Sequence, residues 1–302
     1  MQKYILLLFV ICFLLSACSN QPLNKQSRSE QGIIYSPAMK KDMPYSVYLP
    51  PGWDKQEALP LIIMLHGAGG NHRTFDKYNA GERLDELILA GDLPRAIIVN
   101  PEGELGFWEN WFDGTRHYRD WVVKDLMPHI QKSYPTLACP EHCHVTGISM
   151  GGHGALRFAY YEPETFSSIA VISGPIFTKT YKNKFSLRSV LIKLLLPTKR
   201  IWGDIKNGNG SKTPKDIDPF VSWVENPNMQ DIRLFLTWGD KDHTGIREAN
   251  ELFQKHLETN QRPHSWLVYE GKHKWYDWHT VIAESVRFHI DRKANTTTDV
   301  SG

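Results

Sequence analysis

The chain has 302 residues, of which 41% are hydrophobic, 12% aromatic and 23% charged, and its formal net charge is +2. This composition is that of an ordinary globular protein, and it excludes collagen, coiled coils and disordered chains. The 35 basic and 33 acidic side chains are mixed without a long basic block, so we expect no nucleic-acid partner. At this length one α/β domain is as plausible as two smaller domains, and we start from one domain.

The first 17 residues indicate a secretion signal. Lys3 precedes an apolar run from Tyr4 to Leu15, which is too short to span a bilayer and has the length of a signal peptide's hydrophobic segment. The run ends in Leu-Ser-Ala-Cys18, and this tetrapeptide resembles the lipobox of bacterial lipoproteins. The resemblance implies lipidation at Cys18. An ordinary cleaved signal and an uncleaved anchor are the alternatives.

A lipidated cysteine would place the protein in the bacterial cell envelope. Ser19 follows the cysteine, which resembles lipoproteins sent to the outer membrane, so we expect a lipid anchor there and no other membrane contact. Residues 18–32 are polar and are predicted to be a flexible tether. Residues 292–302 are predicted to be a disordered tail. The catalytic domain would then span residues 33–291.

The remaining cysteines favour a disulfide. Cys12 leaves with the signal and Cys18 would carry lipid, so Cys139 and Cys143 form an even pair in an oxidising compartment. The segment from Cys139 to His144 also permits a metal site. However, a structural zinc needs four tetrahedral ligands, and neighbours in one short stretch diverge. We therefore expect a disulfide and no metal.

Apolar and amphipathic segments alternate along the chain, which predicts an α/β fold with a doubly wound, mostly parallel sheet and helices on both faces. The expected buried strands are Leu59–Leu65, Ala96–Asn100, His144–Gly147, Ser168–Ser173, Ile232–Trp238 and Ser265–Tyr269, after an antiparallel strand Tyr45–Leu49. The expected helices are Glu82–Leu89, Tyr118–Tyr134, Gly151–Tyr161, Gly245–Leu257 and Trp278–Ile290. Pro128 is expected to kink or split its helix. The alternation breaks over residues 176–219, which predicts a cap-like insertion.

A candidate nucleophile lies between a strand and a helix. Gly147-Ile-Ser149-Met-Gly151 fits the pattern G-x-S-x-G, at the point where the chain turns from the fourth predicted strand into a helix. In that context the turn exposes the Ser149 hydroxyl at the carboxyl edge of the sheet. A plain turn is the alternative interpretation of the pentapeptide alone.

A serine hydroxyl needs a base and an orienting acid, and the expected chain order is serine, acid, histidine. Asp240 and Asp242 follow the strand that ends at Trp238, and His273 follows the strand that ends near Glu270. The carboxyl ends of neighbouring parallel strands meet at one edge, so these residues can converge on Ser149. His243, His264 and His279 compete with His273 but occupy less suitable positions.

Two amides are expected to stabilise a negatively charged oxygen on the substrate. Met150 supplies one, and the glycine-rich loop His66-Gly-Ala68-Gly-Gly, which follows an earlier buried strand, supplies the other at Ala68. The loop lacks the Gly-Lys-Ser/Thr and G-x-G-x-x-G patterns of nucleotide sites, and we expect no cofactor.

Several ordered motifs together resemble the putative-esterase family of α/β-hydrolases, which includes esterase D, feruloyl and acetylxylan esterases and mycolyltransferases. The resemblance covers about residues 33–290 and rests on Pro60–Gly70, Val122–Ile130, Thr146–Leu156, Phe166 with Ser173-Gly174, Gly239–Asp242 and Gly271–Trp275. It implies an α/β-hydrolase fold, with Ser149 as nucleophile, Asp242 as acid, His273 as base, and Met150 and Ala68 as oxyanion donors. Asp240 is the second candidate for the acid.

The predicted function is a serine carboxylic-ester hydrolase that works through an acyl-enzyme. The favoured substrate is a small-molecule or carbohydrate-linked acyl ester, because many aromatic rings are available to stack on it. Residues 107–112 are expected to border the site, with Glu109 or Asn110 as hydrogen-bonding groups. S-formylglutathione is disfavoured, because the loop lacks the Leu-Thr-Cys continuation of those hydrolases and the substrate is cytosolic. An acyltransferase of the same fold and a non-catalytic surface-binding lipoprotein are the alternatives.

Overall fold

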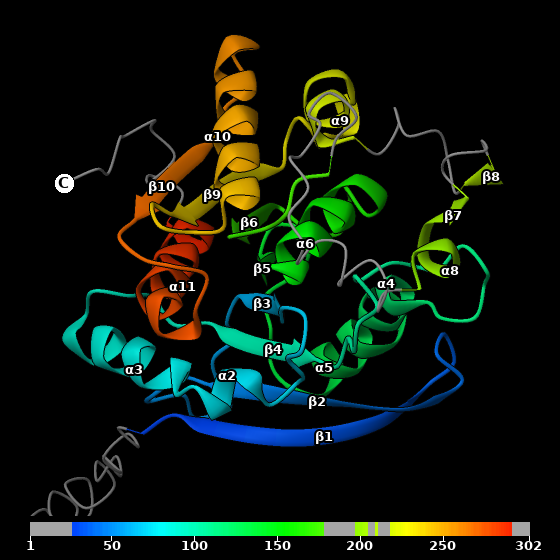
Figure 1. The fold of residues 1–302 in the computed structure, drawn as a ribbon. Helices are drawn as coiled ribbons and strands as arrows, with labels where there is room; N and C mark the ends of the chain where they lie inside the picture. The colour runs from blue at the N-terminus through cyan, green and yellow to red at the C-terminus, as the bar shows by residue number, and fades with distance from the viewer. Residues whose placement is uncertain (1–25, 178–196, 205–208, 211–217, 292–302) are drawn as a thin grey trace, which may run out of the picture.

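The structure is a computed structural model, and it describes residues 26–177, 197–204, 209–210 and 218–291. At its centre lies one eight-stranded sheet in the order β1-β2-β4-β3-β5-β6-β9-β10 (Figure 1). The strands are β1 Arg28–Ser36, β2 Lys41–Leu49, β3 Leu61–Leu65, β4 Ile97–Pro101, β5 Cys143–Ile148, β6 Ser168–Ile172, β9 Arg233–Gly239 and β10 Ser265–Tyr269. β1 and β2 are antiparallel, and the six others run parallel. The predicted α/β fold is therefore confirmed.

Helices cover both faces of the sheet, because the parallel strands are apolar on both sides. In β3, Ile62 and Met64 pack with α2, α3 and α11, whereas Leu61, Ile63 and Leu65 pack with α5, α6 and α10. The helices are α2 Thr74–Lys77, α3 Ala80–Ala90, α4 Tyr118–Asp120, α5 Met127–Ser133, α6 Met150–Tyr161, α8 Thr198–Trp202, α9 Pro219–Glu225, α10 Thr244–Thr259 and α11 Trp275–Ile290. None of the helices described is long and apolar enough to cross a membrane.

The helix predicted over residues 118–134 changes its winding before Pro128. Its middle, Trp121–Leu126, is π-helical, and ordinary α-helix resumes in α5, where Pro128 lies in the first turn. Proline lacks an amide hydrogen and its ring clashes with the carbonyl four residues earlier. The expected kink or split thus takes the form of a wider helical segment on the N-terminal side of the proline.

The strand β1 corrects the predicted extent of the tether. Residues 28–32 were expected to belong to a flexible tether, but they pair with β2 in continuous register from Arg28 opposite Leu49 to Ser36 opposite Lys41. The sequence hides this strand because it lies at the sheet edge, where Ile33 and Tyr35 are exposed. The domain therefore begins by Arg28 rather than at residue 33.

Some predicted segments lie wholly or partly outside the described residues. They are the signal and Cys18, the tether before residue 26, the tail 292–302, and residues 178–196, 205–208 and 211–217 of the insertion. The described part of the insertion contains α8 and the short pair of strands β7 Gly203–Asp204 and β8 Asn209–Gly210, and α9 and a 3₁₀ turn Pro227–Met229 follow it.

Candidate active site

Ser149 lies on a strained turn between β5 and α6. Its backbone has φ 54° and ψ −115°, a combination that residues other than glycine rarely adopt. The turn is possible because glycines, which have no side chain, lie on either side of Ser149. A Cβ at Gly147 would lie 1.9 Å from the carbonyl oxygen of Gly151, and a Cβ at Gly151 would lie 2.0 Å from that of Leu65. The two glycines of the motif thus allow strand and helix to meet closely around Ser149.

The carboxyl ends of β9 and β10 bring an acid and a histidine to this serine. The Ser149 hydroxyl lies 2.8 Å from Nε2 of His273, and Nδ1 of His273 lies 2.9 Å from Oδ1 of Asp242. The Asp242 side chain is fully buried, while that of His273 remains 15% exposed. Because a carboxylate accepts at Nδ1, His273 carries its hydrogen there and leaves Nε2 free to accept the serine proton.

Asp240 occupies a different place in the same turn. Its Oδ1 accepts a hydrogen bond of 2.8 Å from the Gly271 amide, and its side chain is 42% exposed beside Lys241. Asp240 therefore stabilises the loop that carries His273 but does not contact the histidine ring. Of the two carboxylates left open by the sequence, Asp242 is the one that lies against His273.

Asp242 is ionised at neutral pH. Burial raises the pKa of its carboxyl group, but hydrogen bonding and charge from His273, with the Ser173 hydroxyl and the His243 amide, lower that pKa below 3.8. The His243 amide donates to Oδ1 at 2.6 Å. A negative charge at this position can stabilise a protonated His273.

Met150 and the loop that contains Ala68 lie beside Ser149. The Met150 amide begins α6 and has no partner within the helix. The loop containing Ala68 passes directly beside the serine, since a Cβ at Gly67 would lie 3.2 Å from Ser149 Cβ. A carbonyl oxygen bound to Ser149 would therefore meet the edge of this loop and the N-terminus of α6.

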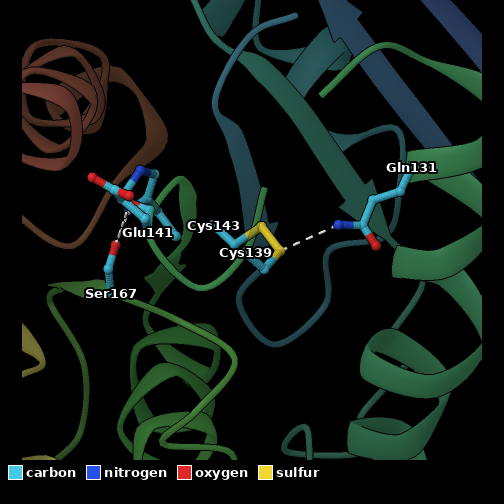
Figure 2. The surroundings of a disulfide bond; sticks show 6 residues. Gln131, Cys139, Glu141, Cys143 and Ser167 are labelled. Carbon is cyan, nitrogen blue, oxygen red and sulfur yellow. Dashed lines mark hydrogen bonds between the residues drawn. A yellow bond between two sulfur atoms is a disulfide. The ribbon is translucent and has the colours of Figure 1, made fainter. Parts of the chain in front are cut away.

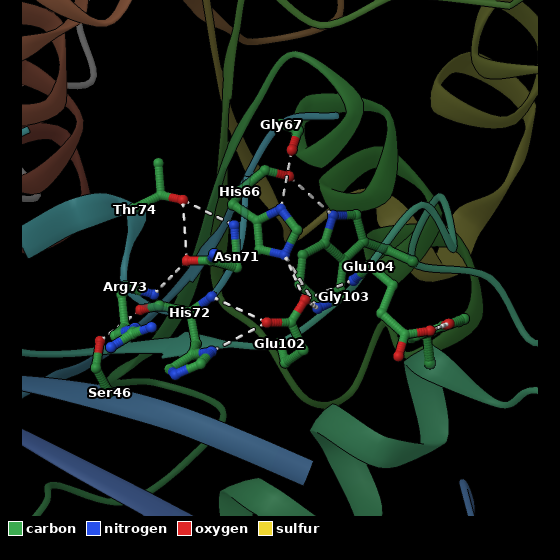
Figure 3. Close-up of polar contacts among 12 residues, drawn as sticks. Ser46, His66, Gly67, Asn71, His72, Arg73, Thr74, Glu102, Gly103 and Glu104 are labelled. Atoms are coloured by element: carbon green, nitrogen blue, oxygen red, sulfur yellow. Dashed lines mark hydrogen bonds and ion pairs between the residues drawn. The ribbon is translucent and has the colours of Figure 1, made fainter. Parts of the chain in front are cut away.

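A polar cluster, which sequence reasoning missed, supports the loop (Figure 3). The Gly103 amide donates to His66 Nε2 at 3.0 Å, so His66 carries its hydrogen on Nδ1, which bonds the Gly67 carbonyl at 2.9 Å. Glu102 accepts from His72 Nδ1 at 3.0 Å. Burial alone would raise the pKa of Glu102, but His66, His72 and the Glu104 amide lower it to about 2. The only sequence signal was the place of His66 between a buried strand and a glycine run.

Glu109 and Asn110 are not available to a substrate, contrary to expectation. Glu109 is 3% exposed and forms an ion pair with Arg157 of α6. The Asn110 amide group donates to Asp120 Oδ1 at 2.7 Å. A buried carboxylate is stable only with a charged or hydrogen-bonded partner, and Arg157 supplies it, so both side chains serve the loop and not the cleft.

A groove adjoins the loop that contains Ala68. Its volume is about 360 Å³, and its lining includes Gly69, Gly70, Glu104, Leu105 and Trp111. The Glu104 carboxylate is partly exposed, and Lys41 and Tyr118 bond to it. An apolar surface with one carboxylate therefore lies beside Gly69 and Gly70 of this loop.

Cys139 and Cys143 are joined in a disulfide, with Cα atoms 5.0 Å apart (Figure 2). Cys143 is the first residue of β5, so the bond closes the turn that leads into the strand before Ser149. Nearby, Ser167 donates to the Glu141 carbonyl at 2.9 Å. Within the described ranges no three His, Cys, Asp or Glu side chains gather as metal ligands would.

The fold and the site together define a serine hydrolase of the α/β-hydrolase class. The chain matches the family described as putative esterase over residues 36–289, and it belongs to that family. This confirms the resemblance seen in the motifs, and it makes the protein a serine carboxylic-ester hydrolase.

The curated relatives of this chain include esterases. An acetyl esterase of Caldicellulosiruptor saccharolyticus is 24% identical over 236 residues, which cover 76% of this chain and 82% of the relative. An endo-1,4-beta-xylanase/feruloyl esterase of Xylanibacter ruminicola is 27% identical over 154 residues, 48% of this chain but 21% of that one.

Solved structures share the fold. A ferulic acid esterase has a TM-score of 0.69 at 20% identity, with 87% of this chain and 98% of that chain covered. A fluorophosphonate-binding serine hydrolase of Staphylococcus aureus has a TM-score of 0.70 at 18% identity, with 88% and 99% covered.

Proposed function

We propose that the protein hydrolyses acyl esters through an acyl-enzyme on Ser149, with His273 as general base and Asp242 as the acid that orients it. The observation that carries the proposal is the continuous chain from the strained Ser149 through His273 to buried Asp242, with contacts of 2.8 and 2.9 Å. Every group stands at the carboxyl edge of a parallel strand. This arrangement supports the catalytic roles, because Ser149 needs a base to accept its proton and His273 needs an acid to orient its ring.

In the first step Ser149 Oγ bonds to the ester carbonyl carbon while its proton passes to His273 Nε2. The carbonyl oxygen becomes negatively charged and accepts hydrogen bonds from the amides of Ala68 and Met150. When the carbonyl re-forms, the bond to the alcohol oxygen breaks and His273 returns the proton to that oxygen. Water then attacks the acyl group in the same way, which releases the carboxylic acid and restores Ser149.

We further propose a carbohydrate-linked acyl ester as the substrate. The groove beside the oxyanion loop supports this, because the side chains of Leu105 and Trp111 give it an apolar wall and Glu104 gives it an acceptor for hydroxyl groups. The relatives whose names include acetyl esterase and xylanase/feruloyl esterase are consistent with it.

A fluorophosphonate reagent tests the nucleophile. We expect one covalent adduct per chain in the intact mass, on the peptide that contains Ser149, since only an activated serine reacts readily. The Ser149→Ala variant is the control and should remain unlabelled. A folded protein without an adduct, or with the adduct on another serine, would contradict the assignment.

Paired substrates test the alcohol group. We expect kcat/KM to be at least about tenfold higher for an acetylated xylo-oligosaccharide than for ethyl acetate, the gain that about 1.4 kcal/mol of added transition-state binding provides. Equal values would reject the sugar and leave the esterase activity in place.

We also propose that Cys18 is lipidated and holds the protein in the bacterial outer membrane. The apolar run before Leu15 and the small residues before Cys18 support this. The full chain, produced in cells fed a labelled fatty acid, should carry the label, and Cys18→Ser should carry none. Equal labelling of the two proteins would reject lipidation.

A further inference from the structure

Close to Asp242, three side chains form a hydrogen-bonded group to which the proposed mechanism gives no role. They are Ser173, which follows β6, Tyr269, which ends β10, and Trp278 in α11. The Ser173 and Tyr269 hydroxyl oxygens lie 2.7 Å apart, and Trp278 Nε1 lies 2.8 Å from the Tyr269 oxygen. Ser173 is fully buried and Trp278 is 4% exposed.

The hydrogens of this group can all point in one direction. Tryptophan Nε1 can only donate, so the Tyr269 oxygen accepts from Trp278. In the contact between Ser173 and Tyr269 either oxygen can be the donor. Burial raises the pKa of Tyr269 to about 12, so the tyrosine keeps its hydrogen and can donate it to Ser173 Oγ. The Ser173 hydrogen is then available to another acceptor.

Asp242 offers the acceptor. Its Oδ1 is occupied by His273 and the His243 amide, whereas Oδ2 is buried and has no hydrogen-bond partner within normal distance among the described residues. Ser173 is also one of the groups that lower the pKa of Asp242, so its hydroxyl faces that carboxylate.

The backbone holds Ser173 rigidly in this place. Its φ is 50°, an uncommon value for serine, and its amide donates to the Thr237 carbonyl of β9 at 2.7 Å. The carbonyl of the preceding residue, Ile172, accepts from the Ser149 amide at 2.8 Å. Ser173 is thus fixed between the strand that presents the nucleophile and the strand that presents the acid.

We propose that Ser173 is a positioning residue: a small shift brings its hydroxyl within hydrogen-bond distance of Oδ2 of Asp242, to which it then donates, and this bond keeps Oδ1 turned toward His273. Tyr269 and Trp278 orient that hydroxyl. The edge of Trp278 also contacts the His273 ring, with ring centres 5.0 Å apart at 87°. The inference rests on the proposed role of Asp242 and adds to it the group that fixes the carboxylate.

The Ser173→Ala variant should lower kcat by about tenfold and leave KM within about twofold, because one hydrogen bond to a charged group is lost. It should also shift the acidic limb of the kcat/KM profile to higher pH. A carboxylate that has lost a donor attracts the proton on His273 more strongly. The other titratable groups nearby, His243 and Asp277, are unchanged in the variant.

Tyr269→Phe is the second variant, because it keeps the ring that fills the space. We expect a smaller loss in kcat, about threefold, with the pH limb shifted in the same direction, since Trp278 Nε1 lies 3.4 Å from Ser173 Oγ and can partly replace the tyrosine.

Matched changes elsewhere separate positioning from stability. Ser285→Ala removes a fully buried hydroxyl from α11, and Tyr48→Phe removes a buried hydroxyl that donates to Asp85 at 2.6 Å. Both controls should keep wild-type kcat and the wild-type pH profile even where they lower the melting temperature.

Three outcomes are decisive. A slower Ser173→Ala with a shifted pH limb, and a milder Tyr269→Phe, supports the proposal. If both variants have the pH profile and kcat of the controls while Asp242→Asn is inactive, the positioning role is wrong and the proposed function stands. If Asp242→Asn keeps the wild-type rate, the acid of the proposed function is wrong, and this inference fails with it.

Discussion

Among the described residues, three serine–histidine contacts measure 2.8 Å, one at Ser149 and two at Ser168, and only the one at Ser149 has the features of a reactive site. Ser149 Oγ lies 2.8 Å from His273 Nε2 at the carboxyl edge of the sheet, and Ser168 Oγ lies 2.8 Å from His289 Nδ1 inside it. Ser168 is fully buried in β6, and His289 of α11 is 1% exposed. The distance alone therefore does not distinguish a nucleophile from a structural hydroxyl.

The difference lies in what surrounds each histidine. His273 has Asp242 on its second nitrogen, whereas the second nitrogen of His289 bonds the Thr146 hydroxyl at 2.8 Å. Burial, the neighbouring His144 ring and Arg233 lower the pKa of His289 well below 6.5 and keep it neutral. A base that cannot hold a proton cannot activate a serine, and no substrate reaches a hydroxyl in the core.

The largest effect is expected when the Asp242 carboxylate beside His273 is removed. Asp242→Asn should lower kcat by up to about 10⁴, because the amide no longer stabilises the working tautomer or the imidazolium. Steady-state hydrolysis of a model acetate ester measures the loss, and circular dichroism checks the fold.

Asp240→Asn is the matched control for that change. It should reduce kcat by no more than about tenfold, since Asp240 bonds the Gly271 amide but not the histidine ring. A greater loss in Asp240→Asn than in Asp242→Asn would contradict the assignment of the acid.

Ser168→Ala tests the inert contact. It should leave kcat near the wild-type value and lower the free energy of unfolding by about 1–3 kcal/mol, because His144 and His289 each lose a buried partner. Urea unfolding gives the stability and ester hydrolysis gives the rate. A large loss of kcat in a folded variant would mean that the buried network acts on the active site.

Acid should first destabilise the buried region around Ser168 and His289. The pKa of His289 is below 6.5 in the folded protein, so the unfolded chain binds more protons as the pH falls below about 6.5. Stability from this group is complete above that pH and is lost on acidification. His153, whose pKa is also lowered by burial, adds in the same direction.

The melting temperature of wild type should therefore fall between pH 7.5 and 5, before carboxylates such as Asp242, whose pKa lies below 3.8, contribute. His289→Gln should melt at a lower temperature at pH 7.5 and show a smaller fall over the same range. Parallel curves for the two proteins would exclude His289 as the source of the pH dependence.

The smallest effect is expected from the disulfide between Cys139 and Cys143. It closes the turn that leads into β5, the strand before Ser149. Replacing Cys139 and Cys143 together by serine should preserve kcat and lower the melting temperature only modestly. The loop is short, and chain entropy gives it less than the ~3 kcal/mol of a 15-residue loop. An inactive, folded double variant would show that the turn positions Ser149 directly.

Much of this site follows from local sequence. The pattern from Gly147 to Gly151 indicates a strained turn once it is placed between a predicted strand and a predicted helix, because both glycines are needed where backbones approach within contact distance. Uniformly apolar runs predict the parallel strands, and parallel strands bring their carboxyl ends to one edge. Ser149 and His273 were predictable for that reason. The edge strand β1 was not, since its polar sequence has no periodicity and its pairing depends on β2.

Only the tertiary structure shows which of Asp240 and Asp242 lies against His273, and only it reveals Ser173, Tyr269 and the contact of Ser168 with His289. Asp240 and Asp242 have the same side chain and lie two residues apart in one turn, so the sequence pattern does not distinguish them. Which one reaches a histidine 31 residues away depends on the direction of each side chain and on the packing of β9 against β10. Local sequence determines where chemistry is possible, and the geometry of residues distant in the chain determines which groups carry it out, because a hydrogen bond requires both a distance and a direction.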